Sequence, residues 1–278
     1  MKIKKPIFIL ASPRSGTTIL YNLFTRHKDT AFPEHFVNKY WQSPWKFKFI
    51  PMLVKQQIIR YKIRPLPHEG KFLSKFFPYG TPLDSTHASQ EIKKYLCSLM
   101  EAEIKAFKAK RFVCKQVDFS FRIKFLNSIF PDANYIIIWR DPRAVVGSLY
   151  TQMSGPWKTK SKDDMDKGWL VVTENFGKNE PLLESCINFY EKYVNSIKRD
   201  LNLIKDRTIE INYEDLVLNP RNELKKLFSF TGLDWYDELN QEIPEQLKLN
   251  TNQSWKKLPR SEKEIIENTF GANKNSKV

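Results

Sequence analysis

Four short apolar segments, separated by stretches with helical spacing, most strongly limit the folds open to this chain. They span residues 7–10, 112–114, 135–139 and 208–211. Segments of this length, rich in isoleucine and aromatic residues, are typical of strands buried on both faces. Strands that alternate with helices predict an α/β domain whose central, mostly parallel sheet is flanked by helices.

Three long helical patterns lie between and after these segments. They span residues 92–107, 182–204 and 220–232. In the first, Glu103 is the one polar residue on an otherwise apolar stripe. Asn219 and Pro220 form a cap and first-turn pair for the third. Ser261 and Glu264 are spaced as a capping box, which predicts another helix start near the C-terminus.

The chain of 278 residues, with 41% hydrophobic residues, is large enough to bury a substantial core. We expect a single α/β domain over residues 1–270. Residues 36–90 are expected to form a helical insertion on the substrate side, because aromatic residues and cations interleave there with few acids. The polar tail over residues 271–278 is expected to fray.

The net charge and the cysteine content indicate which classes of ligand and which cellular compartment to expect. Lysine and arginine total 46 against 31 acids, a formal net charge of +15 that suits phosphates, sulfated compounds, nucleic acid or anionic lipid. The three cysteines form no CxxC pair and the four histidines no ligand spacing, so we expect no protein-built metal site. With too few consecutive apolar residues for a membrane span, the sequence predicts a cytoplasmic protein.

The residues that follow the four predicted strands share a chemistry. They are the loop 12–18, then Lys115, Arg140 and Tyr213. In parallel sheets ligands bind outside the carboxyl ends of the strands, so these residues should meet at one edge. Three of the four carry a positive charge, and a multiply anionic ligand is therefore expected there.

The first of these loops, ASPRSGTT at residues 11–18, joins a strand to a helix. The free N–H groups and the dipole at a helix start both favour an anion, and Gly16 lets the backbone approach it. Thr17 stands where the Walker pattern has its lysine, and Arg14 supplies a cation instead. An ordinary strand-to-helix turn containing a glycine gives the same local pattern.

A second anion motif follows the strand at residues 135–139. Arg140 comes first, then Asp141 and Pro142, and Ser148 lies about two helical turns further on. A guanidinium matches phosphate with a planar fork of donors, and the serine hydroxyl adds one more. Taken alone, Arg140 could instead pair with Asp141 or with a helix carboxylate.

Together, the two motifs resemble the sulfotransferase superfamily that uses 3′-phosphoadenosine 5′-phosphosulfate (PAPS). Residues 13–18 resemble its 5′-phosphosulfate loop, and Arg140 with Ser148 resembles its 3′-phosphate pair. Residues 111–122 are similar to its second strand and the lysine that follows, here Lys115. The resemblance implies a P-loop-like, three-layer α/β fold.

Two weaker similarities extend the implied nucleotide site toward the C-terminus. Residues 211–220 resemble the segment whose tyrosine, here Tyr213, lies near the adenine, and residues 254–259 resemble the late basic loop over the 3′-phosphate. The resemblance assigns these residues to the nucleotide: Arg14, Ser15, Gly16, Thr17, Thr18, Arg140, Ser148, Tyr213, Trp255, Lys256 and Lys257.

The implied reaction moves a sulfuryl group from PAPS to an acceptor hydroxyl or amine, leaving adenosine 3′,5′-bisphosphate (PAP), without a metal. Donors at the bridging oxygen stabilise the charge that grows there, and Arg14, Thr17 and Thr18 are placed for this. Lys115 is expected to contact the transferring sulfonate or the bridging oxygen, which makes it the third catalytic candidate beside Arg14 and a base.

The base is expected to be Glu34. Cytosolic members carry a histidine two residues after the lysine, whereas Lys115 is followed here by Gln116 and Val117. Bacterial and tyrosylprotein-type members instead have a glutamate after the first helix, which matches Glu34. A solvated loop carboxylate is the alternative for Glu34, and His35 is the reserve candidate for the base.

The sequence does not identify the acceptor, which could be a small molecule, a carbohydrate, a glycolipid, a phenol or a peptide. Residues 36–84 could select the acceptor or lie on an anionic membrane, and residues 154–169 could form a lid.

One rival function is a P-loop kinase or NTPase, which would need a cation at position 17 and an aspartate such as Asp118 or Asp141 for Mg²⁺. The other is a basic module that binds membrane or RNA, although no nucleic-acid partner is expected.

Overall fold

A five-stranded parallel sheet forms the centre of the computed structural model, which describes residues 3–33, 44–49, 52, 67, 69, 76–78, 80–155, 176–247 and 253–271. The strands are β1 (Ile7–Leu10), β2 (Thr30–Ala31), β3 (Arg111–Lys115), β4 (Asn134–Trp139) and β5 (Thr208–Asn212), in the order β2-β3-β1-β4-β5. All four predicted strands are confirmed. The two-residue β2 was missed because it is too short to carry a periodic pattern.

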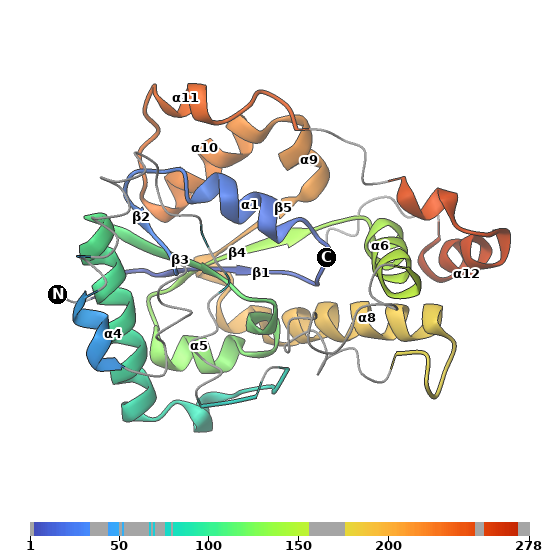
Figure 1. Cartoon of the computed structure of the whole chain (residues 1–278), viewed down its shortest axis with the longest axis horizontal. Coiled ribbons are helices and arrows are strands. Elements are labelled where there is room, and N and C mark those ends of the chain that lie inside the picture. The colour runs from blue at the N-terminus through green and yellow to red at the C-terminus, as the bar shows by residue number, and fades with distance from the viewer. Residues whose placement is uncertain are drawn as a thin grey trace.

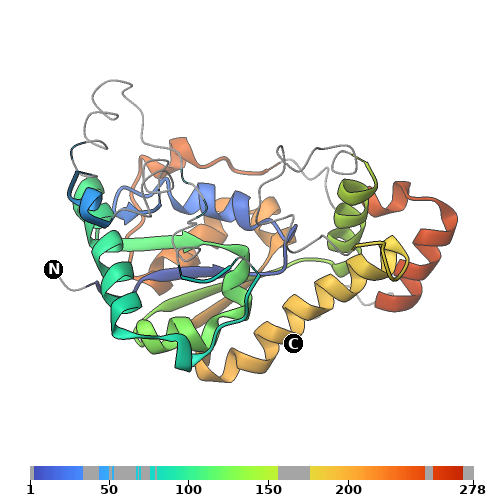
Figure 2. The ribbon, with the colours of Figure 1, turned by 60° about the horizontal axis from the view of Figure 1, so that its bottom comes forward.

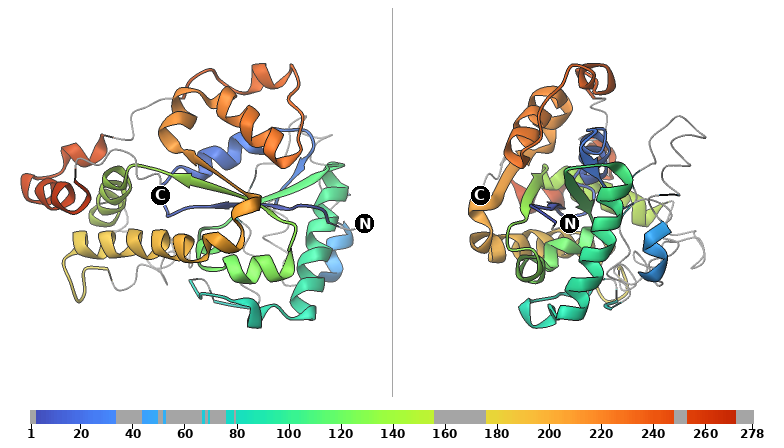
Figure 3. Two further views of the ribbon diagram at one scale, coloured as in Figure 1. Left: turned by 180° about the vertical axis from the view of Figure 1, so that it is seen from behind. Right: turned by 90° about the vertical axis from the view of Figure 1, so that its left-hand side faces the viewer.

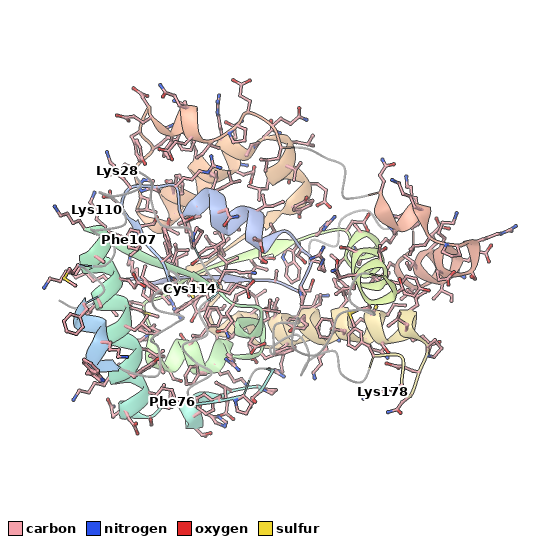
Figure 4. The ribbon with its side chains drawn as sticks, viewed as in Figure 1. Lys28, Phe76, Phe107, Lys110, Cys114 and Lys178 are labelled. Carbon is pink, nitrogen blue, oxygen red and sulfur yellow. The ribbon has the colours of Figure 1, made fainter. Side chains whose placement is uncertain are left out.

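Alternate residues of the central strand enter opposite layers of the core. Phe8 and Leu10 pack with one apolar cluster, whereas Ile7 and Ile9 pack with the other. This two-sided burial explains why the strand reads as a continuous apolar run. Figure 4 shows Cys114 of β3 in the interior of the molecule, with Lys28 and Lys110 at the end where the strands begin.

Helices cover both faces of the sheet and give three layers (Figures 1 and 3). One face is covered by α1 (Thr17–Phe24), α9 (Tyr213–Leu218), α10 (Pro220–Thr231) and α11 (Leu239–Glu242). The other is covered by α4 (Gln90–Phe107), α5 (Ile123–Ile129) and α8 (Leu182–Asp200). The predicted α/β, P-loop-like architecture is confirmed.

A third apolar cluster lies beyond the carboxyl ends of the strands. There α6 (Pro142–Ser154) packs against α8, the 3₁₀ helix η7 (Ser254–Lys257) and α12 (Arg260–Phe270), as Figure 2 shows from another side. The remaining 3₁₀ segments are η1 (Pro44–Phe49), η3 (Ser85–His87), η4 (Val117–Phe121), η5 (Leu201–Leu203) and η6 (Lys205–Arg207).

Most helix bounds agree with the sequence, with two corrections. The second predicted helix ends at Asp200 and continues as η5. The capping box is wrong, since α12 begins at Arg260 and the Ser261 hydroxyl bonds to Glu262 Oε2 at 2.6 Å. The Glu264 carboxylate accepts instead from Arg260 Nε at 2.7 Å, so neither side chain is available for the cap.

Several predictions fall on residues outside the described ranges. Glu34 and His35 are among them, as are most of the insertion at 36–90, the greater part of the segment 154–169 and the tail after Gly271. In the part of the chain that is described, no helix is both long and apolar enough to cross a bilayer.

Candidate active site

A pocket of about 300 Å³ opens where β1, β3 and β4 end. Its described lining comprises Pro13, Arg14, Gly16, Thr17, Thr18, Ile19, Glu69, Lys115, Val117, Arg140 and Tyr213. The sequence placed the first loop, Lys115, Arg140 and Tyr213 at one edge of the sheet, and the structure brings them together in this pocket.

The first loop is held in a conformation that glycine permits. Gly16 has φ +92° at the N-cap of α1, and Arg14 also has a positive φ of 68°. A Cβ on Gly16 would lie 2.2 Å from Cδ2 of the Tyr213 ring, so the ring closes directly over the loop. The close packing of Tyr213 and the positive φ therefore both require glycine at position 16.

Two arginines converge on this loop from different elements. Arg14 Nε donates to Ser148 Oγ of α6 at 3.0 Å, and Arg140 Nη1 donates to the carbonyl oxygen of Arg14 at 2.5 Å. The Arg140 guanidinium also stacks on the Tyr213 ring, 4.4 Å from its centroid. These contacts join the predicted 5′ and 3′ anion motifs into one continuous surface.

The electrostatics of the pocket favour an anion. Burial lowers the pKa of Arg140 from its ordinary value; Tyr213 and Glu214 oppose this effect, and the Arg14 charge adds to it. A partly buried cation near a second cation is stabilised by bound negative charge. An anionic ligand would therefore offset the cost of holding both arginines at one pocket.

Lys115 extends the positive surface from the end of β3. Its side chain is only 4% exposed, and Nζ donates to Thr18 Oγ1 at 3.3 Å. The same ammonium forms an ion pair with Glu69, a residue of the 36–90 region. Sequence reasoning missed Glu69, because it lies in no motif and only the folded chain brings it to Lys115.

The two aspartates that a kinase would need for Mg²⁺ have structural partners. Asp118 pairs with Arg122 at 3.1 Å and accepts from the Gly80 N–H at 2.8 Å, entirely within the interior. Asp141 caps α6 and pairs with Arg143 at 2.7 Å. Neither lines the pocket. Within the described ranges, no three His, Cys, Asp or Glu side chains are grouped so that they could hold a metal ion.

The other predicted nucleotide residues lie outside the pocket lining. The Ser15 hydroxyl is buried 2.7 Å from Ser12 Oγ, and Ser148 contacts the pocket through Arg14. Trp255 is buried against α6, so close that a Cβ on Gly147 would meet its Cβ at 2.4 Å. Lys256 and Lys257 beside it are exposed.

A parallel sheet with a glycine-containing loop and a helix N-terminus at its carboxyl edge defines the P-loop-like class of phosphate-binding α/β proteins. Within that class, the model of the sulfotransferase family matches residues 6–237. The chain therefore belongs to the sulfotransferase family, whose members move a sulfuryl group from PAPS to an acceptor and leave PAP.

Individual relatives agree with this assignment. The omega-hydroxy-beta-dihydromenaquinone-9 sulfotransferase Stf3 of Mycobacterium bovis is 26% identical over 281 residues, covering 89% of this chain and 69% of the relative. Protein-tyrosine sulfotransferase 1 of Danio rerio is 22% identical over 234 residues, covering 83% of this chain and 54% of the relative. The chain thus spans only about half of the tyrosine-directed enzyme.

Solved structures share the fold. Sulfotransferase STF9 from Mycobacterium avium superposes with a TM-score of 0.58 at 15% identity, covering 97% of this chain and 76% of that one. The sulfotransferase domain from the curacin biosynthetic pathway gives 0.54 at 22% identity, covering 97% and 98%. The predicted family and fold are confirmed, and neither the kinase nor the non-enzymatic reading finds support.

Proposed function

We propose that the pocket at the sheet edge binds PAPS, with the phosphosulfate on the loop 13–18 and the 3′-phosphate toward Arg140 and Ser148. The observation that carries this proposal is that Arg14 and Arg140, one from each anion motif, line the same pocket, because a nucleotide with phosphates at both ends needs a cation for each. The stacking of Arg140 on Tyr213 supports a place for the adenine beside that ring.

PAPS supplies an activated sulfuryl group on a phosphate leaving group. The first N–H groups of α1 have no partners within the helix and are available to the leaving phosphate. Arg14, Thr17 and Thr18 add side-chain donors from the same loop, and Lys115 reaches the sulfonate from β3. Donors fixed before the reaction stabilise the developing charge without the cost of reorganising solvent.

The C-terminal segment completes the nucleotide site in this proposal. Trp255 anchors η7 on α6, where Arg143 lies 5.1 Å from the centroid of its indole ring. Lys256 and Lys257 are exposed on the same segment and would add charge beside the 3′-phosphate. The bond from Arg14 to Ser148 supports placing this end of α6 next to the loop.

Glu34 remains our proposal for the base that takes the acceptor proton, with His35 in reserve. We expect Glu34→Gln to lower kcat strongly, because an amide cannot accept that proton, while the Kd for PAP stays unchanged. The measurements are steady-state kinetics and calorimetric titration of PAP, with His35→Asn as the comparison. Near-normal turnover of Glu34→Gln would eliminate Glu34.

We propose that the acceptor is an amphiphilic molecule, such as a glycolipid or another lipid-linked hydroxyl compound, rather than a nucleic acid. Trp45 and Phe49 of η1 are 64% and 40% exposed with ring centroids 6.2 Å apart, and Met52 is 52% exposed. Lys46 Nζ lies 5.4 Å from the centroid of the Trp45 ring. Apolar side chains beside cations favour an anionic bilayer surface. The relative that acts on a menaquinone derivative supports this class. A cytoplasmic location and a single domain over residues 1–270 stay part of the proposal.

The direct test is incubation with labelled PAPS and an acceptor panel that contains soluble sugars, phenols, tyrosine peptides and hydroxylated lipids in anionic vesicles. We expect label transfer to the vesicle-bound lipids, in the presence of EDTA as well as without it. Transfer to soluble acceptors alone would overturn the amphiphilic acceptor and leave the sulfotransferase assignment intact. Mg²⁺-dependent ATP binding in place of PAP binding would overturn the pocket assignment.

A further inference from the structure

Glu69 is the single carboxylate among the described residues that line the pocket, and it forms an ion pair with Lys115. The two partners differ in burial, since the Lys115 side chain is 4% exposed and that of Glu69 is 37% exposed. The lysine is thus fixed by the end of β3 and by Thr18, whereas the glutamate reaches it from the solvent side. Of the two, Glu69 is the partner more accessible to solvent.

A sulfonate at Lys115 and the Glu69 carboxylate compete for the same cation. Both are acceptors with full negative charge, and their mutual repulsion disfavours binding to one ammonium at once. PAP has no sulfonate, so it can occupy the loop while Glu69 stays on Lys115. Occupation of Lys115 by Glu69 therefore depends on whether a sulfuryl group is present in the site.

We infer that Glu69 is a positioning residue that exchanges with the sulfonate on Lys115. It holds the ammonium beside Thr18 when no sulfuryl group is present, and it gives up the contact when PAPS binds. After transfer it recovers Lys115, so the sulfated acceptor loses its cation and can leave. This inference rests on the proposed function, because it requires the sulfonate to reach Lys115.

The test compares calorimetric Kd values for PAPS and PAP, each without acceptor, in the wild-type chain and in Glu69→Gln. We expect Glu69→Gln to tighten PAPS relative to PAP by about fivefold, the size of a partly exposed charge interaction. The same change in a Lys115→Met background should leave the ratio of the two Kd values unaltered. Asp29→Asn, which removes the acid of the Asp29–Lys110 pair at the other end of the sheet, is the matched control and should also leave the ratio unaltered.

Product release gives a second readout. If Glu69 recovers Lys115 after transfer, Glu69→Gln should bind the sulfated acceptor more tightly, and product inhibition should appear at lower concentration. The inference would be overturned if Glu69→Gln left the ratio of the PAPS and PAP Kd values unchanged. It would also be overturned if Glu69→Gln changed that ratio equally in the Lys115→Met background. A Glu69→Gln variant with lower kcat and unchanged Kd for PAPS would overturn it as well, since that pattern belongs to a proton acceptor.

Failure of this inference is distinguishable from failure of the proposed function. If neither Arg140→Met nor Gly16→Ala changes the Kd for PAP, the pocket is not the nucleotide site and the proposed function fails. If PAP binding requires these residues but Glu69→Gln leaves the ratio of the PAPS and PAP Kd values unchanged, only the exchange on Lys115 is wrong.

Discussion

Gly16→Ala is expected to weaken PAP binding by about 100-fold, which is about the loss of one or two hydrogen bonds to a charged phosphate. Alanine at φ +92° is strained, and its methyl group would overlap the Tyr213 ring, with 2.2 Å between Cβ and Cδ2. Either the loop or the ring must move, and both line the pocket. Calorimetric titration of PAP measures the loss of affinity, and thermal unfolding measures the accompanying loss of stability.

Gly232→Ala separates backbone strain from this clash. Gly232 also has a positive φ, 69°, but it ends α10 and does not line the pocket. A Cβ added there would meet the end of the Arg111 side chain at 3.0 Å. We expect this variant to lose about 1 kcal/mol of unfolding free energy from strain and to keep its affinity for PAP. Retained PAP binding in Gly16→Ala would contradict the packing described at Tyr213.

Lys115→Met is expected to lower kcat by about 10² to 10³, the usual cost of one donor to the transition-state charge. Methionine preserves the apolar stem of this nearly buried side chain and removes the ammonium that reaches Thr18 and Glu69. PAP affinity should change little, because the lysine is assigned to the sulfuryl end of the donor. Single-turnover kinetics with saturating PAPS isolates the chemical step from product release.

Lys110→Met is the matched control, since Lys110 precedes the same strand at its far end and its exposed ammonium lies 2.7 Å from the Asp29 carboxylate. It should leave kcat unchanged. A Lys115→Met variant that keeps its kcat but loses PAP affinity would move Lys115 from the sulfuryl group to the nucleotide phosphates.

The sequence predicts those parts of the fold and site in which local pattern and tertiary role coincide. Buried parallel strands are apolar throughout, so the runs at β1 and β4 are visible without a structure. Because the carboxyl ends of parallel strands share an edge, the meeting of the first loop with Lys115 and Arg140 also follows from strand order.

Features set by contacts between distant segments could not be predicted. Glu69 lies 46 residues before Lys115 and belongs to no motif, so only the folded chain pairs them. Asp118 and Arg122 are only four residues apart, but their partners lie in another segment: Asp118 accepts from the Gly80 N–H, and Arg122 donates to the carbonyl oxygens of Pro78 and Thr81. The capping box failed for a different reason, since Arg260 and Glu262 compete for the side chains that would have formed it.

The central claim is that Arg14 and Arg140 hold the two ends of one nucleotide, and a crystal structure of the protein with PAP tests it most directly. The account predicts the 5′-phosphate over the N–H groups at the start of α1 and beside Arg14, with Arg140 in hydrogen-bond contact with the 3′-phosphate and Tyr213 beside the adenine. PAP bound away from this pocket, or bound there with Arg140 still directed only at the Arg14 carbonyl, would contradict it.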